Sequence, residues 1–286
     1  MAKSSYNIND VYSEFNKIDG YFGETKQGKG SVEHANGSIT RYCPQRDESG
    51  YGTCFSYLQM ARSGVINLLE NLKDKNGLEY DKLAEYAILF LSYKLKQHSQ
   101  HKSTNLNYFY TNHIEKNEYY NMKINGDGSP TYKAIIDKKK DLMNMNNNER
   151  SKFNVLFSIL FLLYNENKKN NMDCINHSTK ANEFADQFKE LNDDSNINGN
   201  ASYSRLLSTL SDDYNNLINK CPNFPPLPKV KTPPSKLIPV LSVFPVIPVF
   251  LGIAYKYSLF GIDKLFQRQY IRKKLKKVKK KMKLNI

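Results

Sequence analysis

Several features are scarce or missing in this sequence, and each absence narrows the class of protein. The chain of 286 residues contains no tryptophan and only four cysteines. Only one stretch is apolar and long enough to cross a membrane, which excludes a multi-span membrane protein. Disorder along the whole chain is excluded as well, because 20 tyrosines and 15 phenylalanines supply large side chains for a core.

Acidic residues are nearly missing from the C-terminal tail. Residues 256–286 carry 12 lysines and arginines and one acidic residue, Asp263, so their net charge is +11. The preceding residues carry 30 basic and 27 acidic residues, which is only +3 of the total of +14. A nucleic-acid-binding fold more often spreads positive charge over its folded domain. The distribution therefore argues against a nucleic acid as partner.

Motifs that would indicate a nucleotide, a metal or catalysis are incomplete. Residues 23–31 (GETKQGKGS) nearly match a phosphate-binding loop, but Gly30 stands where a magnesium-binding Ser or Thr is required. His98 and His101 could share one helix face, but no carboxylate or cysteine has ligand spacing with them. We find no nucleophile elbow and no paired-carboxylate signature. The sequence therefore predicts no enzyme activity, metal, cofactor or small-molecule substrate.

The spacing of apolar residues between positions 8 and 220 is helical, and no segment shows sustained strand alternation. We therefore predict an all-α domain over residues 1–221. In one expected helix, the methylenes of Lys94 close the apolar face, and Phe153–Tyr164 is predicted to be a core helix because it is too short to span a membrane. The expected helices lie within residues 8–18, 58–72, 83–94, 106–122, 131–143, 151–166, 178–191 and 202–219.

Residues 20–53 depart from this pattern. They contain seven glycines and little periodicity. We expect a long irregular segment there, either partly disordered or pinned by disulfides.

The apolar stretch is residues 237–255 (LIPVLSVFPVIPVFLGIAY), which contain no charge. As a helix these 19 residues would extend roughly 28 Å, close to the thickness of the hydrocarbon core of a bilayer. They are preceded by residues 222–236, whose six prolines predict an extended stalk. We predict one transmembrane helix; the alternative is a proline-rich apolar linker buried on a soluble domain.

The charges that flank this stretch predict its orientation. Positive charge stays on the cytosolic side, so we expect a cytosolic tail over residues 256–286 and an exoplasmic N-terminal domain. The first residues lack the apolar segment of a signal peptide, so the span is expected to act as an internal signal-anchor. The tail is also a basic amphipathic candidate that could lie on an anionic membrane, or it could serve only as an orientation signal. Its candidate membrane-surface residues are Lys273, Lys274, Lys276, Lys277, Lys279, Lys280 and Lys281.

Cys43, Cys54, Cys174 and Cys221 favour two disulfides, because we place their domain outside the cytosol. Four cysteines allow three connectivities. We favour Cys43 with Cys54 and Cys174 with Cys221, because each pair would join the ends of a local unit. The alternative is that the thiols are free and buried.

Several blocks of the chain resemble the Plasmodium interspersed repeat (PIR) proteins, the variant antigens of malaria parasites called Bir, Cir and Yir in rodent parasites. The longest block is KYSLFGIDKLFQRQYIRKKLKKVKKKM at 256–282, where Ile262-Asp263 replaces a more common aromatic or basic pair. The other blocks are Tyr42-Cys43-Pro44 with Cys54, FYTNHIEKNEYYN at 109–121, LLYNE at 162–166 before Cys174, ANEFADQFKELND at 181–193, and SYSRLLSTLSDDYNNL at 202–217 before Cys221.

This resemblance implies a helical ectodomain, a single membrane span, a short cytosolic tail and no enzyme activity. It also implies a large multigene family that is exported to the infected red cell or its surface, or placed in other parasite membranes. Our primary hypothesis is a single-pass membrane antigen with a role in antigenic variation, immune evasion and binding of a host cell-surface protein. The alternative is a membrane-tethered trafficking or signalling adaptor that acts through the basic cytosolic tail.

Overall fold

The chain divides into two units, Met1–Pro233 and Pro234–Ile286. The computed structural model describes residues 6–28, 30–44, 50, 52–166, 174–233 and 268–279. The main helices of the first unit are α1 (Ile8–Asp19), α2 (Tyr57–Leu72), α3 (Tyr80–Gln97), α6 (Asn147–Glu166), α7 (Ser178–Asp193) and α9 (Ala201–Ile218). The shorter elements are η1 (Gly37–Tyr42), α4 (Leu106–Phe109), η2 (Tyr110–Ile114), η3 (Glu118–Asn121), α5 (Tyr132–Asp137), η4 (Lys140–Asn144) and α8 (Ser195–Asn198).

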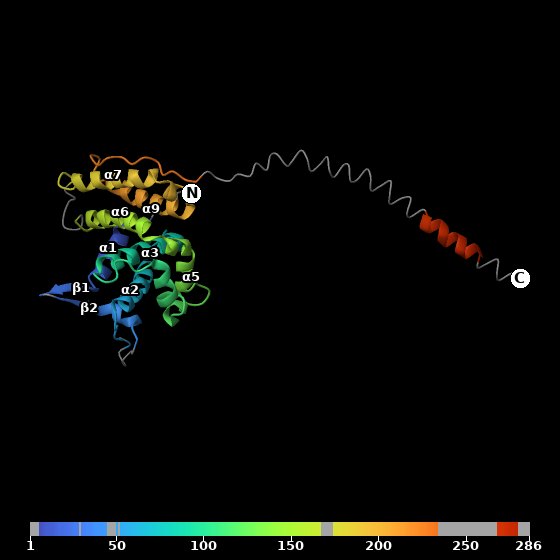
Figure 1. Cartoon of the computed structure of the whole chain (residues 1–286), viewed down its shortest axis with the longest axis horizontal. Coiled ribbons are helices and arrows are strands. Elements are labelled where there is room, and N and C mark those ends of the chain that lie inside the picture. Colours follow the sequence, from blue (N-terminus) through green and yellow to red (C-terminus); the bar gives the residue numbers. More distant parts are fainter. Residues whose placement is uncertain are drawn as a thin grey trace. The chain divides into compact units, whose positions relative to one another are not determined.

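The long helices of the first unit are stacked in layers. Figure 1 shows α7 and α9 above α6, with α1 and α3 below α6 and α2 further down. Helix α6 contacts α1 and α3 on one side and α7 and α9 on the other, so it joins the two halves of the stack. The predicted helical domain is confirmed in outline.

Two helices form the centre of the core. Helix α3 is buried on almost all sides between Leu83 and Leu95, which is the pattern of a helix surrounded by others. Helix α6 buries most of Phe153–Tyr164, so the prediction of a core helix there is confirmed. The large side chains pack as aromatic pairs, such as Phe15 stacked on Phe90 with ring centroids 5.6 Å apart.

Polar caps fix where the helices begin, and one helix begins earlier than we predicted. The side chain of Asn146 accepts hydrogen bonds from the backbone N–H groups of Asn148 and Glu149, both at 2.9 Å. Glu149 in turn accepts from the N–H of Asn146 at 3.1 Å. This reciprocal capping starts α6 at Asn147, before the expected start of that helix at residue 151.

The helix expected over 106–122 is broken into α4, the π-turn η2 and the 3₁₀-turn η3. The side chain of Asn117 accepts the N–H of Tyr119 at 3.1 Å, and this local bond competes with a continuous helix. The helix expected over 131–143 is likewise divided into α5 and η4.

The prediction that residues 20–53 are irregular is wrong for residues 22–42. Strands β1 (Phe22–Gln27) and β2 (Gly30–Ala35) form an antiparallel hairpin, followed by η1. Gln27 pairs with Gly30 at the tip, where Gly28 has the positive φ of 58° that hairpin turns favour. Most of both strands is exposed, so the sequence carries no alternation of apolar residues that could reveal them. Because a strand follows Gly30, the near match to a phosphate-binding loop has no helix to complete it.

The base of the hairpin is anchored in the core. Phe22 is buried against Gly64 of α2, where an added Cβ would lie 2.8 Å from the ring. Lys94 of α3 is only 2% exposed, and its ammonium donates to Asp19 Oδ1 at 2.7 Å and to the backbone oxygen of Phe22 at 2.7 Å. We expected Lys94 to contribute only its methylenes, but its charge is buried and joins α1, β1 and α3.

The proline-rich segment after Cys221 also differs from the prediction, because residues 222–233 lie on the domain as an extended strap (Figure 1, orange). Phe224 is 2% exposed, and Leu227 and Val230 pack against the core. The side-chain amide of Asn192 donates to the oxygen of Lys229 at 2.9 Å and accepts the N–H of Lys231 at 2.7 Å. The folded unit therefore continues through Pro233. Residues 234–236 of the predicted stalk lie outside the described residues.

One buried aspartate connects four helices. Asp213 of α9 is 1% exposed and accepts the hydroxyls of Tyr12 at 3.0 Å and Tyr86 at 2.7 Å. Its backbone oxygen accepts the hydroxyl of Tyr164 at 2.7 Å. These tyrosines come from α1, α3 and α6. Burial raises the pKa of Asp213 to about 7, although Lys82 and the two side-chain hydrogen bonds act in the opposite direction.

In the second unit, residues 268–279 form a helix. Among the described residues, no helix is long and apolar enough to cross a membrane. The predicted span, residues 237–255, lies outside the described part of the chain.

We predict that Asp213→Asn removes a pH dependence of stability. A folded pKa of about 7, against about 3.9 in the unfolded chain, means that the folded state holds the proton more tightly. This contribution is complete below pH 4 and is lost as the pH rises through 7, a loss of about 4 kcal/mol. Urea unfolding at pH 4 to 8 should therefore show the variant gaining stability relative to the wild type as the pH rises. The exposed variant Asp186→Asn on α7 is the control, and parallel curves for wild type and Asp213→Asn would contradict the prediction.

We predict that Asn192→Ala releases the strap. The variant leaves the oxygen of Lys229 and the N–H of Lys231 without their partner, at a cost of about 1–3 kcal/mol. Hydrogen exchange should accelerate at residues 229–231 while α3 keeps its protection. Asn216→Ala is the matched control, because the amide of Asn216 is exposed and bonds within its own helix. Unchanged exchange of the strap in Asn192→Ala would show that other contacts hold it.

Candidate functional site

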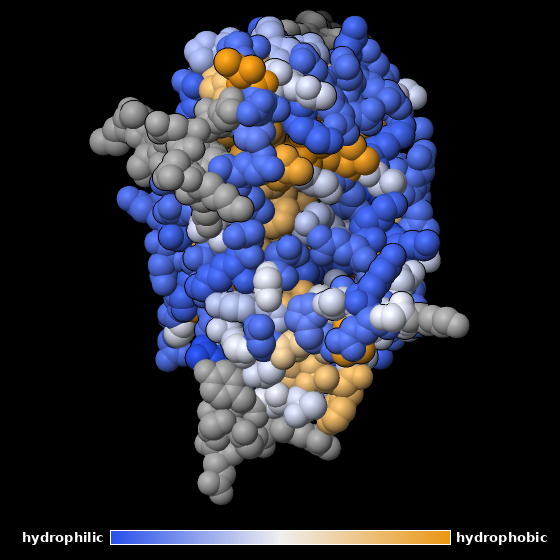
Figure 2. Space-filling view, turned by 90° about the vertical axis from the view of Figure 1, so that its left-hand side faces the viewer, coloured by the Kyte–Doolittle hydropathy of each residue, from blue (hydrophilic) through white to orange (hydrophobic). Residues whose placement is uncertain are grey.

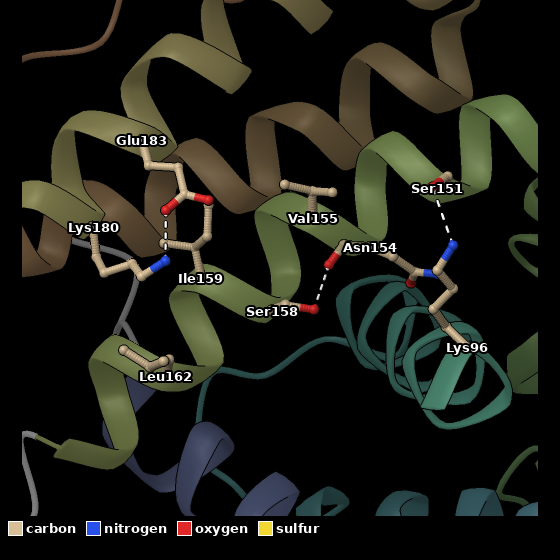
Figure 3. Close-up of a pocket in the computed structure, with 9 residues that line it drawn as sticks. All are labelled: Lys96, Ser151, Asn154, Val155, Ser158, Ile159, Leu162, Lys180 and Glu183. Carbon is tan, nitrogen blue, oxygen red and sulfur yellow. Dashed lines mark hydrogen bonds and ion pairs between the residues drawn. The ribbon is translucent and has the colours of Figure 1, made fainter. Parts of the chain in front are cut away.

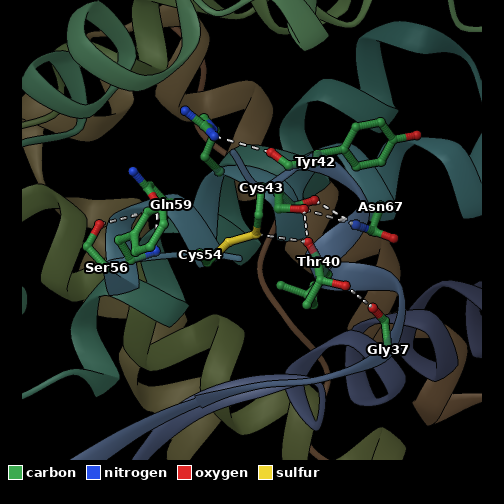
Figure 4. The surroundings of a disulfide bond; sticks show 12 residues. Gly37, Thr40, Tyr42, Cys43, Cys54, Ser56, Gln59 and Asn67 are labelled. Carbon is green, nitrogen blue, oxygen red and sulfur yellow. Dashed lines mark hydrogen bonds between the residues drawn. A yellow bond between two sulfur atoms is a disulfide. The ribbon is translucent and has the colours of Figure 1, made fainter. Parts of the chain in front are cut away.

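The first disulfide joins Cys43 to Cys54, as predicted, with Cα atoms 4.9 Å apart. It lies against α2 (Figure 4), and Cys43 is fully buried. The chain before it is held by α2: Arg62 donates to the oxygen of Tyr42 at 3.2 Å, and the Ser63 hydroxyl donates to the oxygen of Ile39. The bond therefore closes an 11-residue interval that starts where the chain is fixed to α2.

The second disulfide joins Cys174 to Cys221, also as predicted, with Cα atoms 5.5 Å apart. Cys174 precedes α7, and Cys221 follows α9, so the bond ties together the two ends of the last helical pair. Cys221 is fully buried, and the strap begins at the next residue. All four candidate cysteines are thus paired.

A cluster that the sequence analysis missed lies at the base of the hairpin. His98 and His101, at the C-terminal end of α3, have ring centroids 4.6 Å apart. The structure brings Glu33 of β2 to them, with its Oε1 3.0 Å from His98 Nε2. Glu33 is 65 positions from His98 and lies in a segment that we expected to be irregular, so spacing along the chain could not reveal it.

Two groups at this cluster, Glu24 and His101, have pKa values that differ from their usual ones. The hydroxyl of Ser31, with the hydroxyl and N–H of Ser99, lowers the pKa of Glu24 to about 2, so Glu24 stays ionised. Burial, together with nearby His98, lowers the pKa of His101 below its usual value. At neutral pH, His101 is therefore uncharged, and its imidazole can act as a ligand or hydrogen-bond acceptor.

A shallow groove of about 260 Å³ lies along α6. On the face that Figure 2 shows, hydrophobic surface occurs both in the upper half and at the lower right, each time among polar surroundings. In the groove, Val155, Ile159 and Leu162 of α6 provide apolar surface, and an ion pair of Lys180 and Glu183 at 2.6 Å lies on α7 (Figure 3). The volume falls below the usual range of small-molecule sites, so the geometry does not favour a bound metabolite.

Another pair of titratable groups lies in the core and joins helices. Glu85 of α3 and Lys139 form a buried ion pair at 2.7 Å, and the hydroxyl of Thr209 donates to Glu85 at 2.5 Å. Each charge has a partner and sits between helices, which is the arrangement of a structural contact.

The candidate lysines of the tail lie partly in the helix over 268–279. This helix carries Lys273, Lys274, Lys276, Lys277 and Lys279, whereas Lys280 and Lys281 lie outside the described residues. Ile271, Leu275 and Val278 are each about half exposed and follow one another at spacings of four and three. The helix therefore combines one apolar stripe with dense positive charge.

Comparisons with known proteins identify the family. A family model described as Plasmodium variant antigen protein Cir/Yir/Bir matches residues 12–256. A solved structure of a Plasmodium PIR protein ectodomain is 35% identical, covers 78% of this chain and 100% of its own, and aligns with a TM-score of 0.57. A comparison with curated proteins finds no match. The resemblance noted in the sequence is confirmed, and the chain belongs to the Cir/Yir/Bir family of Plasmodium variant antigen proteins.

Proposed function

We propose that this chain is a single-pass membrane antigen that presents its helical domain on the exoplasmic side and serves antigenic variation and immune evasion. The observation that carries the proposal is the family match over residues 12–256, which includes both the helical domain and the apolar stretch 237–255. Contact with a host cell-surface protein is part of the proposed role. Neither a nucleic acid, a small-molecule substrate nor a catalysed reaction is part of it.

The disulfides support exposure to an oxidising compartment. Disulfides persist outside the cytosol and are rare inside it. Both pairs have Cα separations within the range that an unstrained bridge requires. A domain with all four cysteines paired in this way is therefore suited to an extracellular or lumenal location.

The distribution of contacts supports a variable surface. The hairpin β1–β2 is mostly exposed, and of its strand residues only Phe22 at the base is buried. The loops between α2 and α3 and between α3 and α4 also run over the surface of the domain. Substitutions at such positions change the exposed face at little cost to the core.

The basic tail supports the proposed orientation and a membrane-surface role. Residues 268–279 contain seven lysines and arginines and no acidic residue. Positive charge of this density is retained on the cytosolic side and attracts anionic lipid.

A second candidate function is favoured by the same helix. An exposed helix with an apolar stripe and a charged face can also dock on a protein, so the chain could act as a membrane-tethered trafficking or signalling adaptor. The two functions differ in which side of the membrane carries the activity.

We predict that trypsin added to intact infected red cells removes an N-terminal tag and leaves a C-terminal tag in place. The four cysteines should resist alkylation until they are reduced, because each is held in a disulfide. A cytosolic protein of the same cells, which must survive the protease, is the control for intact membranes. A protected N-terminal tag with freely labelled cysteines would overturn the antigen proposal and favour the adaptor.

We predict that replacing Lys273, Lys274, Lys276, Lys277 and Lys279 by glutamine weakens binding of a peptide of residues 256–286 to phosphatidylserine vesicles. Each basic residue contributes about 1 kcal/mol near such a surface, so five replacements should lower the affinity on the order of 10³-fold. A peptide with the same charges in scrambled order tests the apolar stripe, and phosphatidylcholine vesicles test the charge. Equal binding of wild-type and glutamine peptides would contradict a membrane-surface role.

A further inference from the structure

We infer that the base of the β1–β2 hairpin is a binding site for a divalent transition metal of the Zn²⁺ class, with Glu33, His98 and His101 as its ligands. Each of these residues offers one ligand atom, and these atoms all lie within 4.8 Å of one another. Two imidazoles and one carboxylate provide nitrogen and oxygen ligands, a combination that Zn²⁺ commonly binds. Harder cations such as Mg²⁺ prefer ligands that are all oxygen.

The spacing of the ligand atoms is close to what one metal ion requires. Ligands about 2.0–2.1 Å from a tetrahedral ion are about 3.3 Å from each other. His98 Nε2 and Glu33 Oε1 are already 3.0 Å apart, and the third ligand atom must approach by less than 2 Å. Glu33 and His101 are both partly exposed, so their side chains have room for this movement.

The cluster is held in place by residues around it. Tyr57 lies against both imidazoles, with ring centroids 4.2 Å from His98 and 5.9 Å from His101, and its hydroxyl donates to the oxygen of Lys94 at 2.7 Å. His98 itself is 2% exposed. Packing of this kind holds the His98 imidazole in place before an ion arrives, as effective metal sites require.

The hairpin places a second negative charge, that of Glu24, near the cluster and binds the chain that follows α3. Glu24 is the cross-strand partner of Glu33, and it accepts the N–H of Ser99 at 2.7 Å and the hydroxyl of Ser99 at 2.6 Å. Two carboxylates therefore face the end of α3, and only Glu33 is directed at an imidazole. A cation there compensates this charge.

The proton on His98 must move when the ion binds. His98 Nδ1 accepts the N–H of Gln100 at 3.2 Å, so Nε2 carries the proton and donates it to Glu33. Coordination through Nε2 requires this proton to move to Nδ1, which gives up the Gln100 hydrogen bond. His101 presents Nε2 to the metal in the tautomer whose proton is on Nδ1, and the Thr104 hydroxyl, 3.4 Å from Nδ1, can accept a hydrogen bond from that proton. Three protein ligands leave a further position for water, so we expect weaker binding than at a closed four-ligand site.

The test is metal titration of the full chain, purified without an affinity tag, in detergent and after treatment with a chelator. We expect one Zn²⁺ per chain by calorimetry, and a Co²⁺ visible spectrum that Zn²⁺ abolishes. His101→Ala and Glu33→Gln should each weaken Zn²⁺ binding more than about tenfold. Glu33→Gln keeps the size of the side chain and a hydrogen-bond acceptor, so it tests ligation even if His101→Ala unfolds the hairpin.

His177→Ala is the matched control, because His177 precedes α7 and pairs with Glu166 at 3.0 Å instead of joining this cluster. Its Zn²⁺ affinity should equal that of the wild type. The proposal is overturned if no Zn²⁺ binds, or if Glu33→Gln and His101→Ala retain the wild-type affinity. Binding that only His177→Ala abolishes would place the metal elsewhere and would overturn it as well.

Discussion

The arrangement of the long helices depends on the buried residue Asp213. It lies in α9, yet it accepts hydroxyls from α1 and α3, and its own backbone oxygen accepts one from α6. Apolar side chains alone would let these helices slide or rotate at little cost, since many packings have similar volume. Directional bonds to one buried acceptor leave few such alternatives, because any shift leaves a buried polar group unpaired. This fixed arrangement of the helices requires the Asp213 carboxyl to be buried, and burial raises its pKa so that it stays partly protonated.

The same principle operates at the edges of the domain. The buried ammonium of Lys94 secures the hairpin, and the buried amide of Asn192 secures the strap. Each lies near the end of a long helix and holds a segment that lies outside the helices. Disulfides fasten the two remaining intervals, around Cys43 and around Cys174. The hairpin and the strap are therefore held at a few points, which leaves most of their residues exposed.

The sequence predicted what periodicity and composition can carry. The long helices were predicted because their apolar faces repeat every three or four residues, and the cysteine pairs because each joins a local unit. The hairpin was missed because its strands are exposed on both faces. The packing of the strap on the domain was missed because a proline-rich segment is predicted to be extended whether or not it packs against a domain. The contact between Glu33 and His98 was not predicted either, because it exists only when the hairpin forms. Polar contacts between distant segments could not be predicted from the sequence, because they leave no periodic pattern of residues.

A variant antigen needs a frame that tolerates change at its surface, and the contacts of this domain provide one. Several buried donors bind backbone oxygens: Tyr57 binds that of Lys94, Tyr120 that of Arg62, and Arg150 those of Lys102 and Thr104. A backbone oxygen is present whatever side chain the residue carries. Lys102 and Lys229 are exposed, so each can be replaced by another residue while Arg150 and Asn192 keep their bonds. The core thus holds the path of the chain and leaves the identity of exposed side chains free, which is the physical condition for varying a surface while conserving a fold.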